Sequence, residues 1–128
     1  MSAELKVVSV RGDVASAVAA FTRLLTDRGI EVFATIDHGA GAKNAGLELG
    51  DEVVVIFGNP AVGTRLMQAD RRAGLDLPLR VLIWSESGDT SIGYRDPHSL
   101  GQEYELASAT PVLDALSGLM EQLVSSVA

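Results

Sequence analysis

One short stretch constrains the fold of this chain more than any other, the run from Asp51 to Phe57. From Val53 onward every residue of the run is apolar, so a β-strand built from it presents apolar side chains on both faces. Gly58-Asn59-Pro60 ends the run, because proline cannot donate a hydrogen bond to a neighbouring strand. The run therefore predicts a central strand of a sheet, with a neighbour on each side.

The flanking segments complete an α+β pattern. Further strands are predicted at 5–10, 31–36, 79–85 and 90–94, with a hairpin turn at Gly88-Asp89. Helices are predicted from Asp13 to Asp27, from Pro60 to Gly74 and from Thr110 to the C-terminus, with a short helix within 39–46. We expect a single compact domain, 1–128, with a mostly antiparallel sheet of about five strands and helices packed on one face.

Composition excludes several classes of chemistry. The chain has no cysteine, so disulfides, iron–sulfur clusters and thiolate zinc sites are ruled out. It carries 17 acidic and 10 basic residues, a net charge of −7, which argues against nucleic acid or an anionic membrane as a partner. The longest apolar run is far too short to span a bilayer, and the first ten residues do not resemble a signal peptide, so we expect a cytoplasmic protein.

The common catalytic and cofactor motifs are absent. Gly39-Ala40-Gly41 follows a predicted strand, but Asn44 stands where a dinucleotide fingerprint requires glycine. Lys43-Asn44 likewise departs from a phosphate-binding P-loop. The two histidines, His38 and His98, lie far apart in sequence, so their spacing predicts no metal site. We therefore expect no cofactor and no metal.

Four segments nevertheless form a recognisable pattern, in the order Val32–Leu47, Val55–Gln68, Leu77–Leu82 and Tyr94–Pro97. Together they resemble the signature of the DUF302 family of uncharacterised bacterial and archaeal proteins, over about residues 12–106. The resemblance implies a compact α+β fold of the β-α-β4-α type, often a homodimer, with no established reaction. Many members continue with a pattern similar to Tyr-Leu-x-x-Arg-His-x-Leu, whereas Glu103-Tyr104 replaces the Arg-His pair here.

Three of these segments place turn-forming residues at a predicted strand end: Asp-His-Gly, Phe-Gly-Asn-Pro and Tyr-Arg-Asp-Pro. If the strands share one sheet, these ends are expected to meet at one polar rim, where loops gather binding residues. Glycine backbone and a helix N-terminus after Pro60 would favour an anion there. We expect a small anionic or polar ligand to be bound by Asp37, His38, Lys43, Asn59, Thr64, Arg65, Tyr94 and Asp96.

Three classes of function remain open at this point. The first is a non-enzymatic module that binds a small ligand or a partner. The second is an enzyme acting on a small anionic substrate, with His38 as general acid/base and Asp37 orienting it. The third is a structural role through homodimerisation. A concave site around His38 would favour the enzyme, and an apolar surface patch on the hairpin 79–94 or the helix 110–127 would favour assembly.

The same motif residues also have a purely structural explanation. Asp37 is suited to cap a short helix that follows it, and Gly58-Asn59-Pro60 is suited to form a turn. These alternatives make different demands on geometry, because a cap bonds to its own helix whereas a ligand-binding group faces open space.

Overall fold

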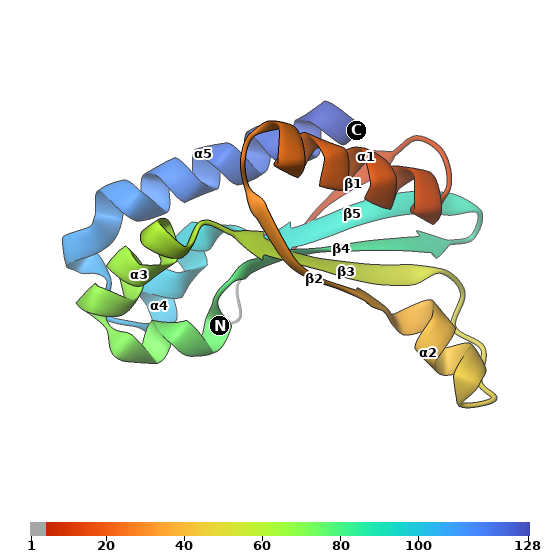
Figure 1. The fold of residues 1–128 in the computed structure, drawn as a ribbon, viewed down its shortest axis with the longest axis horizontal. Coiled ribbons are helices and arrows are strands. Elements are labelled where there is room, and N and C mark those ends of the chain that lie inside the picture. The colour runs from red at the N-terminus through yellow and green to blue at the C-terminus, as the bar shows by residue number, and fades with distance from the viewer. Residues whose placement is uncertain (1–4) are drawn as a thin grey trace.

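A computed structural model describes residues 5–128, so part of the segment used to judge a signal peptide lies outside the described residues. The sheet is antiparallel and has the strand order β1-β5-β4-β3-β2. Its strands are Leu5–Val10 (β1), Glu31–Asp37 (β2), Glu52–Gly58 (β3), Leu79–Glu86 (β4) and Asp89–Arg95 (β5). The predicted α+β fold is confirmed (Figure 1).

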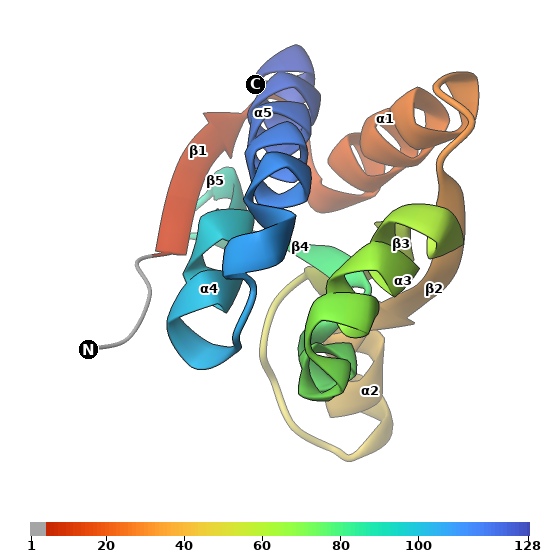
Figure 2. The same cartoon turned by 90° about the vertical axis from the view of Figure 1, so that its left-hand side faces the viewer.

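Two long helices lie over one face of this sheet (Figures 1 and 2). The helices are Val14–Asp27 (α1), His38–Asn44 (α2), Pro60–Ala69 (α3), Leu100–Glu103 (α4) and Thr110–Val127 (α5). Three 3-10 segments are described as well, at Arg71–Asp76, Pro97–Ser99 and Ala107–Ala109. In residues 5–128, no helix combines the length and the apolar character that a membrane crossing requires.

Side-chain caps mark the residues at which α1, α2 and α3 begin. The Asp13 carboxylate accepts a 2.8 Å hydrogen bond from the Ser16 amide at the start of α1, as the sequence predicts. The predicted helix from Pro60 to Gly74 is wrong at its far end, because α3 stops at Ala69. Asp70 has extended backbone angles (φ −150°, ψ 111°) and its side chain caps the next 3-10 segment instead. One continuous helical pattern in the sequence is thus two elements in space.

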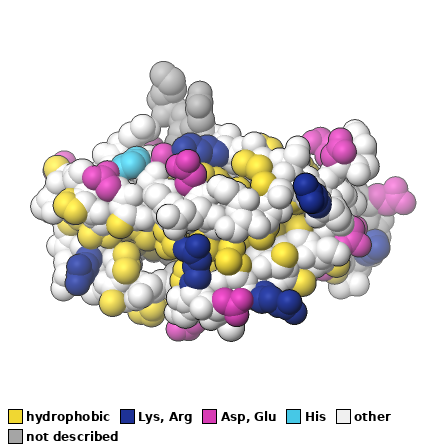
Figure 3. All heavy atoms as spheres, turned by 90° about the horizontal axis from the view of Figure 1, so that it is seen from above, with side chains coloured by type: hydrophobic (Ala, Val, Ile, Leu, Met, Phe, Trp, Pro, Cys, Tyr) yellow, Lys and Arg dark blue, Asp and Glu magenta, His cyan; other side chains and the backbone are white. Residues whose placement is uncertain are grey.

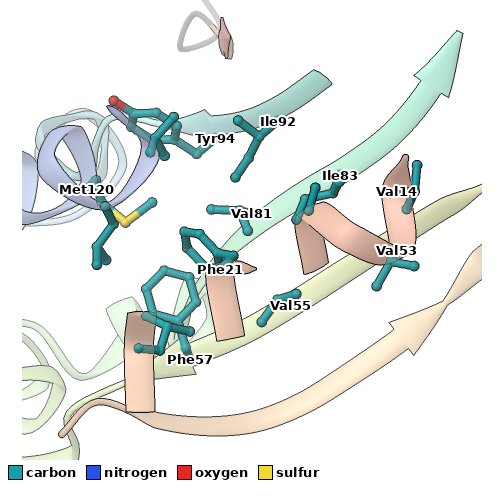
Figure 4. Close-up of a cluster of buried hydrophobic side chains, with 14 residues drawn as sticks. Val14, Phe21, Val53, Val55, Phe57, Val81, Ile83, Ile92, Tyr94 and Met120 are labelled. Carbon is teal, nitrogen blue, oxygen red and sulfur yellow. The ribbon is translucent and has the colours of Figure 1, made fainter. Parts of the chain in front are cut away.

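Strand β3 has the two neighbours that its apolar sequence predicts. Val55 lies opposite Thr35 of β2 and opposite Val81 of β4. On the helix side, Val53, Val55 and Phe57 are buried in the main core, where the Phe57 and Phe21 rings meet edge to face at 5.4 Å (Figure 4). On the other side, Val54 and Ile56 are only half-buried. The sheet is therefore covered by helices on one face only.

We expect Leu123→Ala to lower the free energy of unfolding by about 2–4 kcal/mol, because this side chain is fully buried in the main core and its loss leaves a cavity. Leu75→Ala is the matched control, since Leu75 is 84% exposed and its truncation should change stability by less than about 0.5 kcal/mol. Urea unfolding followed by circular dichroism measures both. Equal losses in the two variants would contradict this account of the core.

Candidate functional site

The predicted strand ends do not all meet at one rim. Strands β2 and β3 are antiparallel, so Asp37 lies opposite Val53 while Glu31 lies opposite Gly58. Asp37 thus lies beside the start of β3, whereas Asn59 follows the end of β3, about 20 Å from Val53 over six residue steps. The expected convergence is wrong for Asp37, His38 and Lys43. Neighbouring strands of an antiparallel sheet run in opposite directions, so their C-terminal ends lie at opposite ends of the sheet.

The other motifs do gather at one end of the sheet. Phe57 is paired with Leu79, which places Gly58-Asn59-Pro60 beside Leu77-Pro78. The pairing of β4 with β5 brings Arg95 to the same end, and Asp96 follows it. Three of the four motif segments therefore share this end of the molecule, and the Asp-His-Gly segment is at the other (Figure 1).

The Asp-His-Gly segment has clear structural roles. The Asp37 carboxylate caps α2 by accepting a 2.8 Å hydrogen bond from the Ala40 amide, so the structural alternative for this residue is confirmed. Gly39 is buried against the chain that leads into β3, and a Cβ there would lie 2.6 Å from the Gly50 carbonyl oxygen. His38 and Lys43 are exposed, and His38 lines neither of the clefts described below.

Tyr94 and Asp96 belong to a polar cluster that joins the end of β5 to α5. Tyr94 is buried in the main core, and this burial raises the pKa of its phenol. Asp96 Oδ2 lies 3.4 Å from Lys6 Nζ. Asp96 Oδ1 accepts a 3.0 Å hydrogen bond from the His98 amide and lies 3.1 Å from His98 Nδ1. On its far side, His98 Nε2 is 2.6 Å from Asp114 Oδ1 in α5.

The imidazole of His98 is therefore held between two carboxylates. Its hydrogen bond to Asp114, aided by Asp96, raises the pKa of His98. Partial burial acts to raise the pKa of Asp96, but hydrogen bonds from the His98 amide, Ser117 and Lys6 outweigh it and lower that pKa. Every charge of this cluster has a partner inside it, so the cluster connects two elements rather than presenting a free reactive group. Asp114 has no sequence signal that links it to His98.

A second polar region surrounds Glu103 and Tyr104, which replace the Arg-His pair of many family members. The Tyr104 hydroxyl donates a 2.6 Å hydrogen bond to Asp76 Oδ2, which raises the pKa of this tyrosine. Asp70 accepts hydrogen bonds from the Arg72 side chain and from the Glu105 amide, which lower the pKa of Asp70. A polar cleft of about 320 Å³ adjoins these residues. Their polar groups are occupied by one another.

A larger cleft is apolar and lies between α3, α5 and the ends of β3 and β4. Its volume is about 400 Å³. The lining residues are Ile30, Phe33, Phe57, Gly58, Asn59, Pro60, Val62, Gly63, Thr64, Met67, Gly74, Leu77, Pro78, Leu79, Leu116 and Leu119. None of these lining residues is charged. Figure 3 shows the helix side of the molecule, where hydrophobic side chains are visible between polar ones.

Of the eight predicted ligand-binding residues, only Asn59 and Thr64 line this cleft. Asn59 Oδ1 accepts a 2.9 Å hydrogen bond from the Ala61 amide, which leaves the two hydrogens of its Nδ2 as donors. The Thr64 hydroxyl donates to the Pro60 carbonyl at 2.7 Å, which leaves its oxygen as an acceptor. Arg65, one residue further along α3, is exposed and outside the lining. The sequence missed the apolar walls because they come from separate elements.

Comparison with known proteins agrees with the fold. A family model described as "Domain of unknown function DUF302" matches residues 6–123. A crystal structure of an uncharacterized conserved DUF302 protein from Bacillus stearothermophilus has a TM-score of 0.74 to this chain, at 19% sequence identity, with 96% of this chain and 94% of that one covered. The similarity at this identity concerns the fold.

Two curated relatives carry the name fluoride-specific ion channel FluC 1. The protein from Brucella suis and the protein from Brucella abortus are each 42% identical to this chain over 109 residues, or 84% of its length. The match covers 43% of the first and 40% of the second. The chain thus spans about two-fifths of the length of these relatives, and their name describes the longer proteins.

We expect Gly39→Ala to destabilise the fold by about 1–3 kcal/mol. The added methyl group would lie 2.6 Å from the carbonyl oxygen of Gly50, which is closer than van der Waals contact allows. Gly41→Ala in the same helix is the control, since a Cβ there has no neighbour within 4 Å and alanine favours a helix more than glycine does. Chemical denaturation compares the two. Equal stability of both variants would show that the close packing of α2 is not required.

We expect the stabilising effect of His98 to depend on pH. Its pKa is raised in the folded state, so its contribution is complete below the unfolded value of 6.5 and is lost as the pH rises through the folded pKa. His98→Gln should therefore lower the melting temperature more at about pH 5.5 than at about pH 9. Thermal melts at the two pH values test this, with His38→Gln as control. A His98→Gln deficit that does not change with pH would contradict it.

Proposed function

Because this chain belongs to the DUF302 family, a family of domains of unknown function, we propose that it binds a small and largely apolar molecule in the cleft between α3 and α5. The observation that carries the proposal is the cleft itself. Its volume of about 400 Å³ lies in the range of small-molecule sites, roughly 300–1,000 Å³, and its lining is apolar with a few polar groups, as such sites usually are.

The motif segments support this use of the cleft. Most of its lining residues lie in three of the four segments that resemble the family signature. Gly63 keeps one turn of α3 free of side chain, and Met67 beside it has an unbranched, adaptable side chain. These features leave space at the cleft and let its wall adjust to a ligand.

The chemistry of the lining favours a ligand different from the one expected from the sequence. Without a charged lining residue, the cleft has no strong attraction for a small anion. The apolar walls instead favour a hydrocarbon or aromatic body, and the donor of Asn59 and the acceptor of Thr64 suit one polar group on it. The lining has no titratable side chain, so it supports binding rather than acid–base catalysis.

The test uses a neutral, apolar fluorescent dye, N-phenyl-1-naphthylamine, and its displacement by straight-chain alcohols of increasing length. We expect displacement to strengthen by about 0.8 kcal/mol for each added methylene until the cleft is full. Gly63→Leu should abolish specific displacement by filling the cleft, without loss of fold, because a Cβ at this position meets only the end of Met67 at 3.9 Å.

Gly118→Leu is the matched control for this substitution. Gly118 is an exposed glycine of α5 with no heavy atom near its Cβ direction, and it does not line the cleft. This variant should bind the dye and the alcohols as the unmodified protein does. Undiminished alcohol binding by Gly63→Leu, or the absence of alcohol binding by the unmodified protein, would overturn the proposed function.

A further inference from the structure

A β-bulge in strand β2 places one aromatic side chain at the cleft. Val32 is paired with Phe57 of β3. The preceding residue of β3, Ile56, is paired with Ala34, so Phe33 is an extra residue with no partner opposite it in β3. In an unbroken strand Phe33 would point away from Val32, to the face of the sheet without helices. With the bulge it lines the cleft on the helix side, and bulges commonly re-aim a side chain in this way next to functional sites.

The ring of Phe33 stays open to solvent although it belongs to the lining of an apolar cleft. Its exposed fraction is 41%, whereas Phe57, which lines the same cleft, is fully buried. Strand β2 is the last strand of the sheet, so no further strand of the described chain covers this side (Figure 2). Phe33 therefore lies where the cleft opens, and it still has apolar area that a ligand can bury.

Gly58 lies next to this ring, and neither its backbone nor its surroundings require a glycine. It is the last residue of β3, and its φ lies outside the positive range that favours glycine. A Cβ built on Gly58 would lie 3.6 Å from Cβ of Pro78 and 3.7 Å from Cε2 of Phe33, which is ordinary van der Waals contact. The glycine therefore leaves one carbon-sized position open between Phe33 and Pro78.

This open position matches the thickness of an aromatic ring. A carbon atom placed there would contact Phe33 and Pro78 at the same time without moving either side chain, and both of these residues line the cleft. A planar ring is one carbon atom thick, whereas a saturated ring is puckered and thicker. An alkyl chain also fits, but it lacks the additional stabilisation that two aromatic rings in contact provide beyond the burial of apolar area.

We propose that the ligand of the cleft carries a planar, neutral aromatic ring, which is held between Phe33 and Pro78 beside Gly58. This inference rests on the proposed function, because it specifies the class of ligand that occupies the same cleft. The ring is neutral because no lining residue carries a charge. Asn59 directly follows Gly58, and its side-chain amide offers a donor to a hydroxyl or carbonyl group on the ring. Phe33 is then the residue that selects aromatic ligands over saturated ones.

Two ligands with the same carbon skeleton and the same hydroxyl group test the proposal, planar 2-naphthol and saturated decahydro-2-naphthol. NMR titration of the isotope-labelled protein gives the dissociation constant of each. We expect 2-naphthol to bind at least about fivefold more tightly, because contact between aromatic rings adds to the burial of apolar area. Phe33→Leu should bring this ratio close to one, since leucine keeps an apolar side chain without a ring, whereas Phe33→Tyr should retain the preference. Both variants should still bind the straight-chain alcohols.

Gly58→Ala tests the open position while Phe33 stays in place. The added methyl group should occupy the position of a ring carbon and weaken 2-naphthol binding at least about fivefold. The fold should tolerate it, because its contacts are of ordinary length. Gly41→Ala is the matched control, since a Cβ there has no neighbour within 4 Å and Gly41 does not line the cleft. This control should bind both naphthols as the unmodified protein does.

The outcomes separate this inference from the proposed function. Equal affinity for the two naphthols, a preference that survives Phe33→Leu, or undiminished 2-naphthol binding by Gly58→Ala would overturn the aromatic assignment. If the straight-chain alcohols still bind in that case, the proposed function stands. Failure of the alcohols and of both naphthols to bind would overturn the proposed function, and the aromatic assignment with it.

Discussion

The packing of Phe57 against Phe21 is the contact around which the helix side of this domain is organised. Phe57 is fully buried near the end of β3, where its ring meets the ring of Phe21 in α1 edge to face. The same residue lines the apolar cleft. Because one side chain closes the main core and forms part of the cleft wall, the shape of the cleft depends on how α1 and β3 pack, as well as on the helices that border it.

The cleft exists because the apolar side chains form two clusters rather than one. The main core lies between the sheet and the helices α1 and α5, and a second cluster gathers around Leu66, Leu106 and Leu113. Leu79 contacts both clusters. Leu116 belongs to the second cluster while Leu119, on the next turn of α5, packs against the first, and both line the cleft. The cleft is thus the space where two separately filled clusters meet along one helix.

The sequence was a good guide to elements and a poor guide to their relative placement. The apolar run of β3 predicted two neighbouring strands correctly, and the caps at Asp13 and Asp37 act as the local pattern indicates. The end of α3 was missed because the extended backbone of Asp70 interrupts an otherwise helical pattern. Caps and strands can be predicted from the sequence, since each depends on residues only a few positions apart.

Site geometry depends on strand direction, which local rules do not contain. Asp37 ends β2 and Asn59 follows β3, yet the antiparallel pairing of these strands puts the two residues at opposite ends of the sheet. The contact between His98 and Asp114 and the approach of Gly39 to Gly50 likewise join residues that only the complete fold brings together.

Helix α5 has a consequence for how the domain loses its structure. Its first half supplies Leu113 and Leu116 to the second cluster, and its second half supplies Met120, Leu123 and Val124 to the main core. A continuous helix links the two halves, so neither cluster keeps its full set of contacts if this helix detaches. We therefore infer that the two clusters unfold together in one cooperative transition, although they are packed as separate groups of side chains.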